Sequence, residues 1–244
     1  MSATDQTPLK NKVAVITGAS SGIGSATAQE LDAAGMKLVL VARSEKKLLD
    51  VQSKLTSASI LPLDVTQDGA AEKAIEFAQQ TYGDLDVLVN NAGMMAIGAV
   101  EELDLDKAMA MVRLNVEAAF RLAILAARVM KARGDGFIVN LSSVAGLKTA
   151  PGMAVYNGTK FAIEGFSDAL RIEMAQSGVR VGSVQPGTVN TNLYDTWSGD
   201  QLDLVHSGGA LEADDVARSI LFMLEQPAHL TIGRLFAMPS RSGI

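Results

Sequence analysis

The chain has 244 residues, of which 48% are hydrophobic and 20% charged, as in ordinary globular proteins. Its net charge of −6, without a cluster of Lys and Arg, argues against a nucleic-acid partner. The absence of cysteine excludes disulfides, thiolate metal sites and cysteine nucleophiles.

The N-terminal stretch is polar and lacks the apolar segment of a signal peptide. Charges interrupt every apolar run before it reaches the roughly 18 residues of a membrane span. We therefore expect a cytoplasmic protein without a membrane partner, and the length allows one large core or two small domains.

Short apolar segments alternate with amphipathic helical patterns along the chain. Several of these segments are apolar at nearly every position, which is typical of parallel strands covered on both faces. The predicted strands are 13–17, 38–41, 59–63, 87–90, 137–141, 179–185 and 230–237, and the predicted helices are 22–34, 45–55, 68–82, 104–132, 154–177 and 213–226. Without a Pro/Gly-rich linker, seven such alternations predict one doubly wound α/β domain over residues 1–244.

A glycine-rich turn, T-G-A-S-S-G-I-G, follows the first predicted strand at 17–24. Glycines at Gly18, Gly22 and Gly24 permit positive φ angles and a close backbone approach to a ligand. The N-terminus of the next predicted helix would present free N–H groups to a pyrophosphate. The alternative is a turn that serves only tight packing of strand and helix, but its position after the first strand favours dinucleotide binding.

The second predicted strand ends in V-A-R-S, with Ala42 where an acid would bind the ribose hydroxyls of NAD(H). Arg43 and Ser44 follow, and a guanidinium suits the 2′-phosphate of NADP(H). The alternative is an arginine that only begins a solvated helix with Lys46 and Lys47. We favour NADP(H) because the acid is missing.

Tyr156 and Lys160 lie four residues apart in Y-N-G-T-K and would project from one face of a helix. A phenol has an ordinary pKa near ~10, and a neighbouring ammonium lowers it by stabilising the phenolate. Such a pair can exchange a proton with a carbonyl or alcohol oxygen, although the spacing alone is common.

Two serines, Ser142 and Ser143, lie at the C-terminal end of the fifth predicted strand, where ligands bind in open α/β sheets. Either can hydrogen-bond a substrate oxygen, and spacing does not separate them. Asn115, inside the predicted helix 104–132, is unfavourable for a helix and is either structural or part of a proton relay.

In combination, these features closely resemble the short-chain dehydrogenase/reductase family in its compact single-domain branch. The resemblance extends from about Lys12 to the C-terminus. It rests on the motifs at 17–24, 63–65 (L-D-V), 90–93 (N-N-A-G), Asn115, 142–146 (S-S-V-A-G), 156–160 and 186–191 (P-G-T-V-N-T).

The resemblance implies a Rossmann-like sheet of seven parallel strands with helices on both faces. It assigns Tyr156 as the acid/base, Lys160 as its partner, and Ser143 rather than Ser142 as the donor to the substrate oxygen. It implies that Asn115 holds a water linked to Lys160, and that Asn90 ties the central strands together.

The same resemblance implies a binding site for NADP(H), with Asp64 and Val65 at the adenine, Asn91 at its ribose, and Val189 and Thr191 at the nicotinamide. The expected cofactor-binding residues are Gly18, Ser20, Ser21, Gly22, Ile23, Gly24, Arg43, Ser44, Asp64, Val65, Asn91, Tyr156, Lys160, Pro186, Val189 and Thr191. The expected reaction is hydride transfer between nicotinamide and a ketone or secondary alcohol, with the protein positioning the reactants.

The expected substrate pocket combines residues after strand ends with residues of the irregular segment 187–210, which we interpret as a lid; a plain surface loop is the alternative. Besides Ser143, its expected members are Met94, Met95, Val144, Met153, Tyr194 and Trp197. Methionine suits adaptable apolar pockets, although it is more often core.

A ketone is the leading substrate class. The alternative is a 3-oxo acid or semialdehyde, since Arg234 or Arg241 can supply a cation for a carboxylate and the C-terminal stretch vaguely resembles bacterial 3-hydroxy-acid dehydrogenases of this family. Nothing pairs the two histidines, His206 and His229, so no metal is expected.

Members of this family are commonly dimers or tetramers, and we expect the same here through the helices at 104–132 and 154–177. The first has an apolar stripe that can also serve core packing: Met109, Val112, Val116, Phe120 and 122–124. The rival functions are a non-catalytic NADP(H)-binding regulator and an NAD(H)-preferring dehydrogenase.

Overall fold

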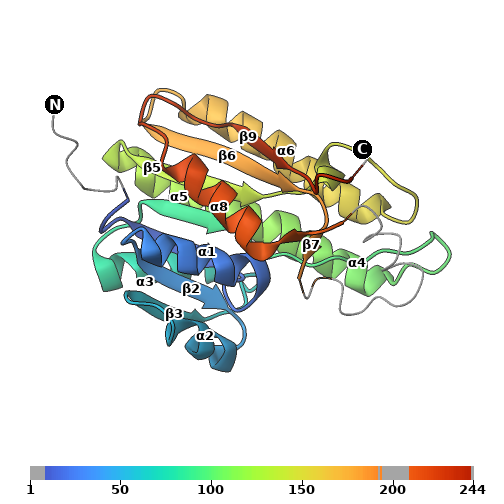
Figure 1. The fold of residues 1–244 in the computed structure, drawn as a ribbon, viewed down its shortest axis with the longest axis horizontal. Helices are drawn as coiled ribbons and strands as arrows, with labels where there is room; N and C mark the ends of the chain where they lie inside the picture. The colour runs from blue at the N-terminus through green and yellow to red at the C-terminus, as the bar shows by residue number, and fades with distance from the viewer. Residues whose placement is uncertain (1–8, 192, 194–208, 243–244) are drawn as a thin grey trace.

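The structure, a computed structural model, describes residues 9–191, 193 and 209–242. Within them lies one seven-stranded parallel sheet in the order β3-β2-β1-β4-β5-β6-β9, with helices on both faces (Figure 1). The strands are β1 (Val13–Thr17), β2 (Lys37–Ala42), β3 (Ala58–Pro62), β4 (Val87–Asn90), β5 (Gly136–Leu141), β6 (Val179–Pro186) and β9 (Arg234–Ala237). This Rossmann-like architecture confirms the predicted fold class.

Continuous apolar sequence forms the central strands because both faces of the sheet are covered. In β1, Ala14 and Ile16 pack in one core with helices α1, α2 and α8, whereas Val13 and Val15 pack in the other with α3, α5 and α6. All five residues of β1 are buried. These helices are α1 (Gly22–Ala33), α2 (Glu45–Gln52), α3 (Ala70–Tyr82), α5 (Ala119–Arg133), α6 (Ala154–Met174) and α8 (Ala213–Leu224).

Three predicted boundaries differ from the structure by three residues or more. Helix α2 stops at Gln52 because the amides of Lys54 and Leu55 bond carbonyls three residues back, which ends the helix in a tight turn. Helix α6 likewise stops at Met174, three residues before its predicted end. Strand β9 begins at Arg234, four residues after the predicted start, where its pairing with β6 begins.

The predicted single helix over 104–132 is wrong in its middle. The structure has α4 (Leu105–Val112), then a π-helical segment η1 (Arg113–Ala118), then α5. A π segment inserts extra backbone into a helix and is frequently found at functional sites. The apolar stripe predicted along 104–132 does not face one environment, because Leu122 is buried while Met109 and Ile124 are exposed.

The predicted lid, 187–210, is described only at its two ends. There β7 (Val189–Asn190) pairs in parallel with β8 (Leu211–Glu212). Helix α8 follows β8 directly, and a reciprocal capping box between Glu212 and Asp215 fixes its start. Residues 192 and 194–208 lie outside the described part of the chain.

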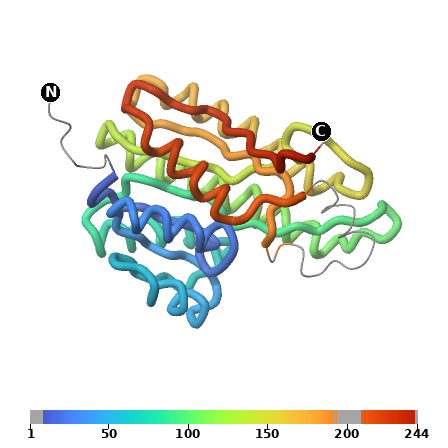
Figure 2. The backbone as a smooth tube through the Cα atoms, in the orientation of Figure 1, coloured from blue at the N-terminus to red at the C-terminus, as the bar shows by residue number. Residues whose placement is uncertain are grey.

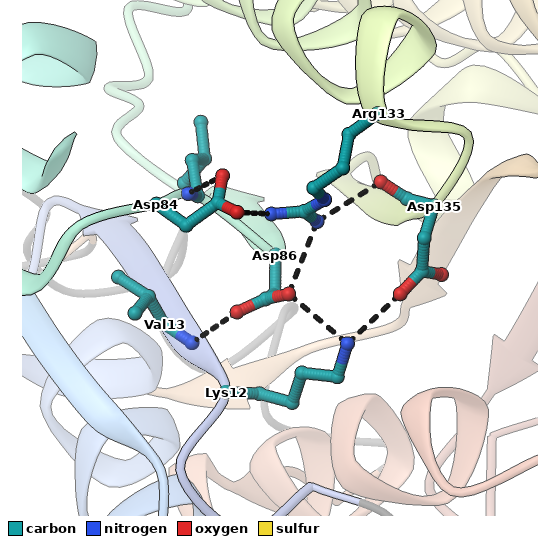
Figure 3. A network of polar contacts seen from close by, with 7 residues as sticks. Lys12, Val13, Asp84, Asp86, Arg133 and Asp135 are labelled. Carbon is teal, nitrogen blue, oxygen red and sulfur yellow. Dashed lines mark hydrogen bonds and ion pairs between the residues drawn. The ribbon is translucent and has the colours of Figure 1, made fainter.

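A network of ion pairs links the strands at their amino ends (Figure 3). Lys12, Asp86 and Asp135 precede β1, β4 and β5, and the Lys12 ammonium lies 3.1 Å from the Asp86 carboxylate and 2.8 Å from that of Asp135. Arg133, at the end of α5, pairs with Asp84 and Asp86. This network therefore joins three neighbouring strands at the end opposite their carboxyl ends.

Across the described ranges, none of the helices has the length and apolar character needed to cross a membrane.

Candidate active site

A cavity of about 850 Å³ opens at the carboxyl ends of the strands. The chain forms β1, β2 and β3 in turn and then returns to the centre of the sheet to form β4 on the other side of β1 (Figure 2). Residues that follow β1 and β4 both line the cavity, so it lies at this switch in strand order. Open α/β sheets bind their ligands at this switch in strand order. Its lining residues follow β1, β2, β3, β4, β5 and β6 and include one side of α6.

The glycine turn forms one wall of this cavity. Gly18 and Gly22 have φ angles of +66° and +51°, which favour glycine. A Cβ atom on Gly24 would lie 2.3 Å from the carbonyl oxygen of Gly18, so this glycine lets α1 pack against the turn. Gly24 thus serves packing, whereas the other expected cofactor residues of the turn line the cavity: Gly18, Ser20, Ser21, Gly22 and Ile23.

The end of β2 supplies cationic residues to the same cavity. Ala42 and Arg43 line it, as does Ser44, whose hydroxyl caps α2 by accepting a bond from the Lys47 backbone N–H at 3.4 Å. Lys47, which sequence reasoning treated only as a solvated helix residue, also lines the cavity. The lining residues that follow this strand therefore include two positive side chains and no acid, a charge distribution that suits a phosphate.

Asp64 and Val65 line the cavity after β3. The Asp64 carboxylate accepts bonds from the hydroxyl and the N–H of Thr66, at 2.7 and 3.0 Å. Burial acts to raise the pKa of Asp64, but these bonds and the charge of Arg43 hold it below its ordinary value. The carboxylate is therefore ionised at neutral pH and fixes the turn after β3.

Two asparagines join the central strands. The Asn90 amide donates to the Ala119 carbonyl at 2.7 Å and to the Asn140 side chain of β5 at 3.2 Å. Asn91 donates from its side chain to the Thr17 carbonyl at 2.8 Å and lines the cavity. These bonds set the spacing between the ends of β1, β4 and β5.

Tyr156 and Lys160 lie in the first two turns of α6, and both line the cavity. They are 5% and 8% exposed, and the Lys160 ammonium lies 5.8 Å from the centre of the Tyr156 ring. The ammonium donates to the Leu141 carbonyl at 3.0 Å. Burial lowers the pKa of Lys160 to about 8, against the opposing charge of Glu164.

Both serines after β5 line the cavity. Ser143 Oγ accepts a bond from the Ala145 N–H at 3.1 Å and lies 3.5 Å from the Pro186 carbonyl oxygen. It thereby starts the short helix η2 (Val144–Gly146). Ser142 Oγ is buried and has no hydrogen-bond partner within the described ranges. The geometry leaves both hydroxyls next to the cavity.

Asn115 lies behind the cavity wall, in the π segment. Its side chain binds the backbone of Met94 twice, accepting from the N–H and donating to the carbonyl, each at 2.9 Å. It also donates to the Thr159 hydroxyl of α6 at 3.3 Å. Asn115 therefore ties the loop after β4 to the helix that holds Tyr156 and Lys160.

The expected substrate residues divide into three groups. Met94 and Met95 line the cavity together with Ser143. Val144 and Met153 are half-buried but are not among the described residues that line it; Met153 packs near Tyr156 in a small apolar cluster. Tyr194 and Trp197 fall outside the described residues.

The last residue of β6, Pro186, and the segment after it complete the cavity, the latter through Val189 and Thr191. The cavity lining also contains residues that the sequence analysis did not predict, and one of them, Arg113, is charged. Arg113 reaches the cavity from the π segment, which no apolar periodicity indicates. Arg234, expected as a possible carboxylate partner, is instead ion-paired with Glu164 and Asp168.

Comparison with known proteins agrees with this architecture. The family model described as short chain dehydrogenase matches residues 12–202. A protein of Staphylococcus aureus (strain MRSA252) named an uncharacterized oxidoreductase is 33% identical over 235 residues, which cover 96% of this chain and 99% of the relative. Another of that name, from Staphylococcus saprophyticus, is 32% identical over 95% of this chain and 98% of its own length.

Two solved structures are similar over nearly the whole chain. The closed form of a serine dehydrogenase complexed with NADP+ has a TM-score of 0.89 at 26% identity and covers 95% of this chain and 96% of its own. A short chain dehydrogenase/reductase family protein has a TM-score of 0.83 at 28% identity, with 95% and 97% covered.

The fold and cavity define a Rossmann-like protein with a dinucleotide-type ligand site. The chain belongs to the short-chain dehydrogenase/reductase family and is an oxidoreductase of that family. This confirms the resemblance drawn from its motifs.

Proposed function

We propose that the protein is an NADP(H)-dependent carbonyl reductase, or alcohol dehydrogenase in the reverse direction. The observation that carries this proposal is the convergence of Ser143, Tyr156 and Lys160 on the cavity that the glycine turn also lines. The set comes from β5 and α6, whereas the turn comes from β1 and α1. Dinucleotide binding alone would not require the hydroxyl, phenol and ammonium together.

The cavity fits a dinucleotide along its length. Gly18, Gly22 and the start of α1 leave room and free N–H groups for a pyrophosphate, because a Cβ on Gly22 would come within 3.2 Å of Thr191. Asp64, Val65 and Asn91 would hold the adenosine end, and Pro186, Val189 and Thr191 the nicotinamide end. When bound, NADP(H) supplies or accepts the hydride.

The chain's own residues then handle the proton. Ser143 and Tyr156 would donate hydrogen bonds to the carbonyl oxygen, and Tyr156 would pass its proton to that oxygen. Lys160, held by the Leu141 carbonyl, would stabilise the phenolate that remains. Asn115 would hold the loop after β4 against α6. We also propose that a water molecule lies between Asn115 and Lys160.

The preference for NADP(H) over NAD(H) rests on charge. Arg43 and Lys47 line the cavity beside Ala42, where an acid would be needed to bind the ribose hydroxyls of NAD(H). The solved structure of the similar serine dehydrogenase holds NADP+, which supports the same choice.

For the substrate, we propose a small or medium ketone, since Met94 and Met95 give the cavity an adaptable apolar wall. A 3-hydroxy or 3-oxo acid is the second candidate, favoured by the similarity to a serine dehydrogenase. Arg234 is already paired with two carboxylates, so a substrate carboxylate would need another cation.

We further propose that residues 1–244 form one domain of a cytoplasmic homodimer or homotetramer. Apolar side chains exposed on the paired helices support assembly there: Met109, Ile124, Phe161 and Ile172. The Phe120 and Phe166 rings stack across α5 and α6 with centroids 4.0 Å apart, which joins the two helices into one face.

Oxidation of NADPH and of NADH, each against neutral ketones, aldehydes and 3-oxo acids, tests the proposed function. We expect turnover with NADPH and a neutral ketone. Turnover confined to acids would select the second candidate. Tight NADPH binding without turnover of any carbonyl would favour a non-catalytic regulator and contradict the proposal.

A further inference from the structure

A buried carboxylate lies one helical turn beyond Lys160. Glu164, also on α6, is 3% exposed. Its Oε2 accepts a bond from the Ser183 hydroxyl of β6 at 3.1 Å and lies 3.3 Å from Nε of Arg234 on β9. Its other oxygen is buried without a hydrogen-bond partner within the described ranges. The proposed proton transfer does not use this group.

The spacing places this carboxylate beside the catalytic pair. Residues four apart on a helix share one face, so Lys160 and Glu164 both face the sheet from α6. The Lys160 ammonium turns to the end of β5, where it binds the Leu141 carbonyl. The Glu164 carboxylate turns to β6 and β9. The two groups do not form a direct ion pair, but opposite charges one helical turn apart still attract each other where water is excluded.

Few other charges face this part of α6. On α6 itself the neighbouring titratable groups are Tyr156 and, one turn beyond Glu164, Asp168. From β9 the charged group is Arg234, which pairs with both Glu164 and Asp168 and whose side chain is 42% exposed. Arg113 of η1 lines the cavity and is exposed. The side chains that β5, β6 and η1 bring into hydrogen-bond contact with buried groups of α6 are neutral: Asn140, Ser183 and Asn115.

We propose that Glu164 is a positioning residue whose fixed negative charge keeps the Lys160 ammonium protonated and the Tyr156–Lys160 pair matched to neutral pH. The inference rests on the proposed function, because it gives Glu164 a role through Lys160. Ser183 and Arg234 hold the carboxylate in place from two strands. The two effects on the pKa of Lys160 agree with this role, since burial lowers it and the charge of Glu164 raises it.

The sign of the expected effect does not depend on which member of the pair titrates. A negative charge near coupled groups raises their apparent pKa values, so its removal lowers them. Glu164→Gln keeps the shape and an oxygen that can accept from Ser183. The pH profile of kcat/KM should therefore move to lower pH by about 1 unit.

Asp168→Asn is the matched control. Asp168 also pairs with Arg234, but it lies one further turn from Lys160 and is partly exposed. Both variants thus replace one carboxylate partner of Arg234 by an amide, and only Glu164→Gln removes the charge next to Lys160. Glu164→Asp retains the charge and should restore most of the wild-type profile.

The experiment measures carbonyl reduction with NADPH from about pH 5 to 10 for each variant, together with NADPH binding by fluorescence and folding by circular dichroism. A shifted profile for Glu164→Gln, with the control unshifted and NADPH binding retained, supports the proposal. An unshifted profile in a folded, active Glu164→Gln variant overturns it.

Failure of the proposed function would look different, because the wild type would then reduce no carbonyl at any pH. If Glu164→Gln does not fold, the double variant Glu164→Met/Arg234→Leu carries the test, since apolar replacement of a buried ion pair is often tolerated. Its profile should shift in the same direction, as Glu164 is the member nearer Lys160, and an unshifted profile would again overturn the proposal.

Discussion

Arg43 is the side chain on which the proposed preference for NADP(H) over NAD(H) most depends. It follows β2, lines the cavity and has no acidic neighbour at position 42. Lys47 comes to the same wall because Ser44 starts α2 there, which places it one turn from Arg43. The sequence already indicates Arg43, because no acid stands at position 42, but Lys47 looks there like a residue of a solvated helix, and only the cavity distinguishes it from Lys46.

We expect Arg43→Ala to weaken NADPH binding about 10- to 100-fold, the loss typical of a charge-assisted hydrogen bond. NADH binding should change little, because NADH has no 2′-phosphate. Fluorescence titration of both nucleotides measures this. Lys46→Ala, an exposed neighbour that does not line the cavity, is the control. Equal losses for NADPH and NADH would contradict the role of Arg43 as a phosphate ligand.

Among the elements, the strands are the part that the sequence predicts best. Burial on both faces makes each central strand apolar throughout, and that pattern depends only on neighbouring residues. The π segment was missed because its stabilising contacts are distant in sequence: Asn115 binds the backbone of Met94, 21 residues earlier. Periodicity carries no signal of such a pairing.

The loop between β5 and α6 is likewise held by a residue with no sequence signal. Asn157, next to Tyr156, donates to the carbonyls of Ala145 and Lys148, each at 2.7 Å, and is 4% exposed. It thereby fixes the loop that begins at Ser143. In the sequence it is an asparagine between a tyrosine and a glycine, and no pattern indicates its role.

Asn157→Ala would leave these two carbonyls without their donor. We expect kcat/KM for the carbonyl substrate to fall about 10- to 100-fold because Ser143 loses its position. NADPH affinity should stay within about 2-fold of the wild type, since the glycine turn is untouched. Steady-state kinetics and nucleotide titration measure the two effects. Unchanged kcat/KM, or an equal loss of NADPH binding, would contradict this role, and partial rescue by Asn157→Ser would support it.

At the scale of the whole molecule, the candidate active site and the ion-pair network lie at opposite ends of the strands. The cavity lies at the carboxyl ends of the strands. The ion-pair network lies at their amino ends (Figure 3) and consists of Lys12, Asp84, Asp86, Arg133 and Asp135. Asp86 also accepts a bond from the Val13 N–H at 2.7 Å. Changes in the network should therefore alter stability more than catalysis.

We expect Asp86→Ala to lower the free energy of unfolding by about 1–3 kcal/mol, because it leaves the Val13 N–H without its side-chain acceptor and removes one carboxylate partner from each of Lys12 and Arg133. Urea unfolding at neutral pH measures it. Glu117→Ala, which breaks an exposed pair with Arg121, should change stability by no more than about 0.5 kcal/mol. A similar loss in both variants would contradict the role of the network.

Acid should weaken the same network. The Arg133 hydrogen bond holds the pKa of Asp84 below its ordinary value, and for Asp135 the pairing with Lys12 outweighs burial and also lowers the pKa. A carboxyl whose pKa is lower in the folded than in the unfolded state stabilises the fold at every pH above its ordinary, unfolded-state pKa. That contribution is lost as the pH falls below about 4. Urea unfolding from neutral pH downward should show this loss, and stability that rises on acidification through this range would contradict it.

The site shows how far sequence reasoning extends. Short motifs marked the glycine turn, Ser143, Tyr156 and Lys160, because each motif contains its residues within a few positions. Glu164 could not be identified as a buried ion-pair member, since in a helical pattern an acid usually faces solvent. Its burial depends on Arg234, 70 residues later, which only the pairing of β6 with β9 brings near.

The measurement that tests the central proposal most directly is a comparison of Tyr156→Phe with the wild type in single-turnover reduction of the best carbonyl substrate by NADPH. Phenylalanine keeps the ring and removes the proton donor. The account predicts that NADPH binding persists while the rate of reduction falls by at least about 100-fold. Reduction by the variant at a rate near that of the wild type would contradict the assignment of Tyr156 as the acid.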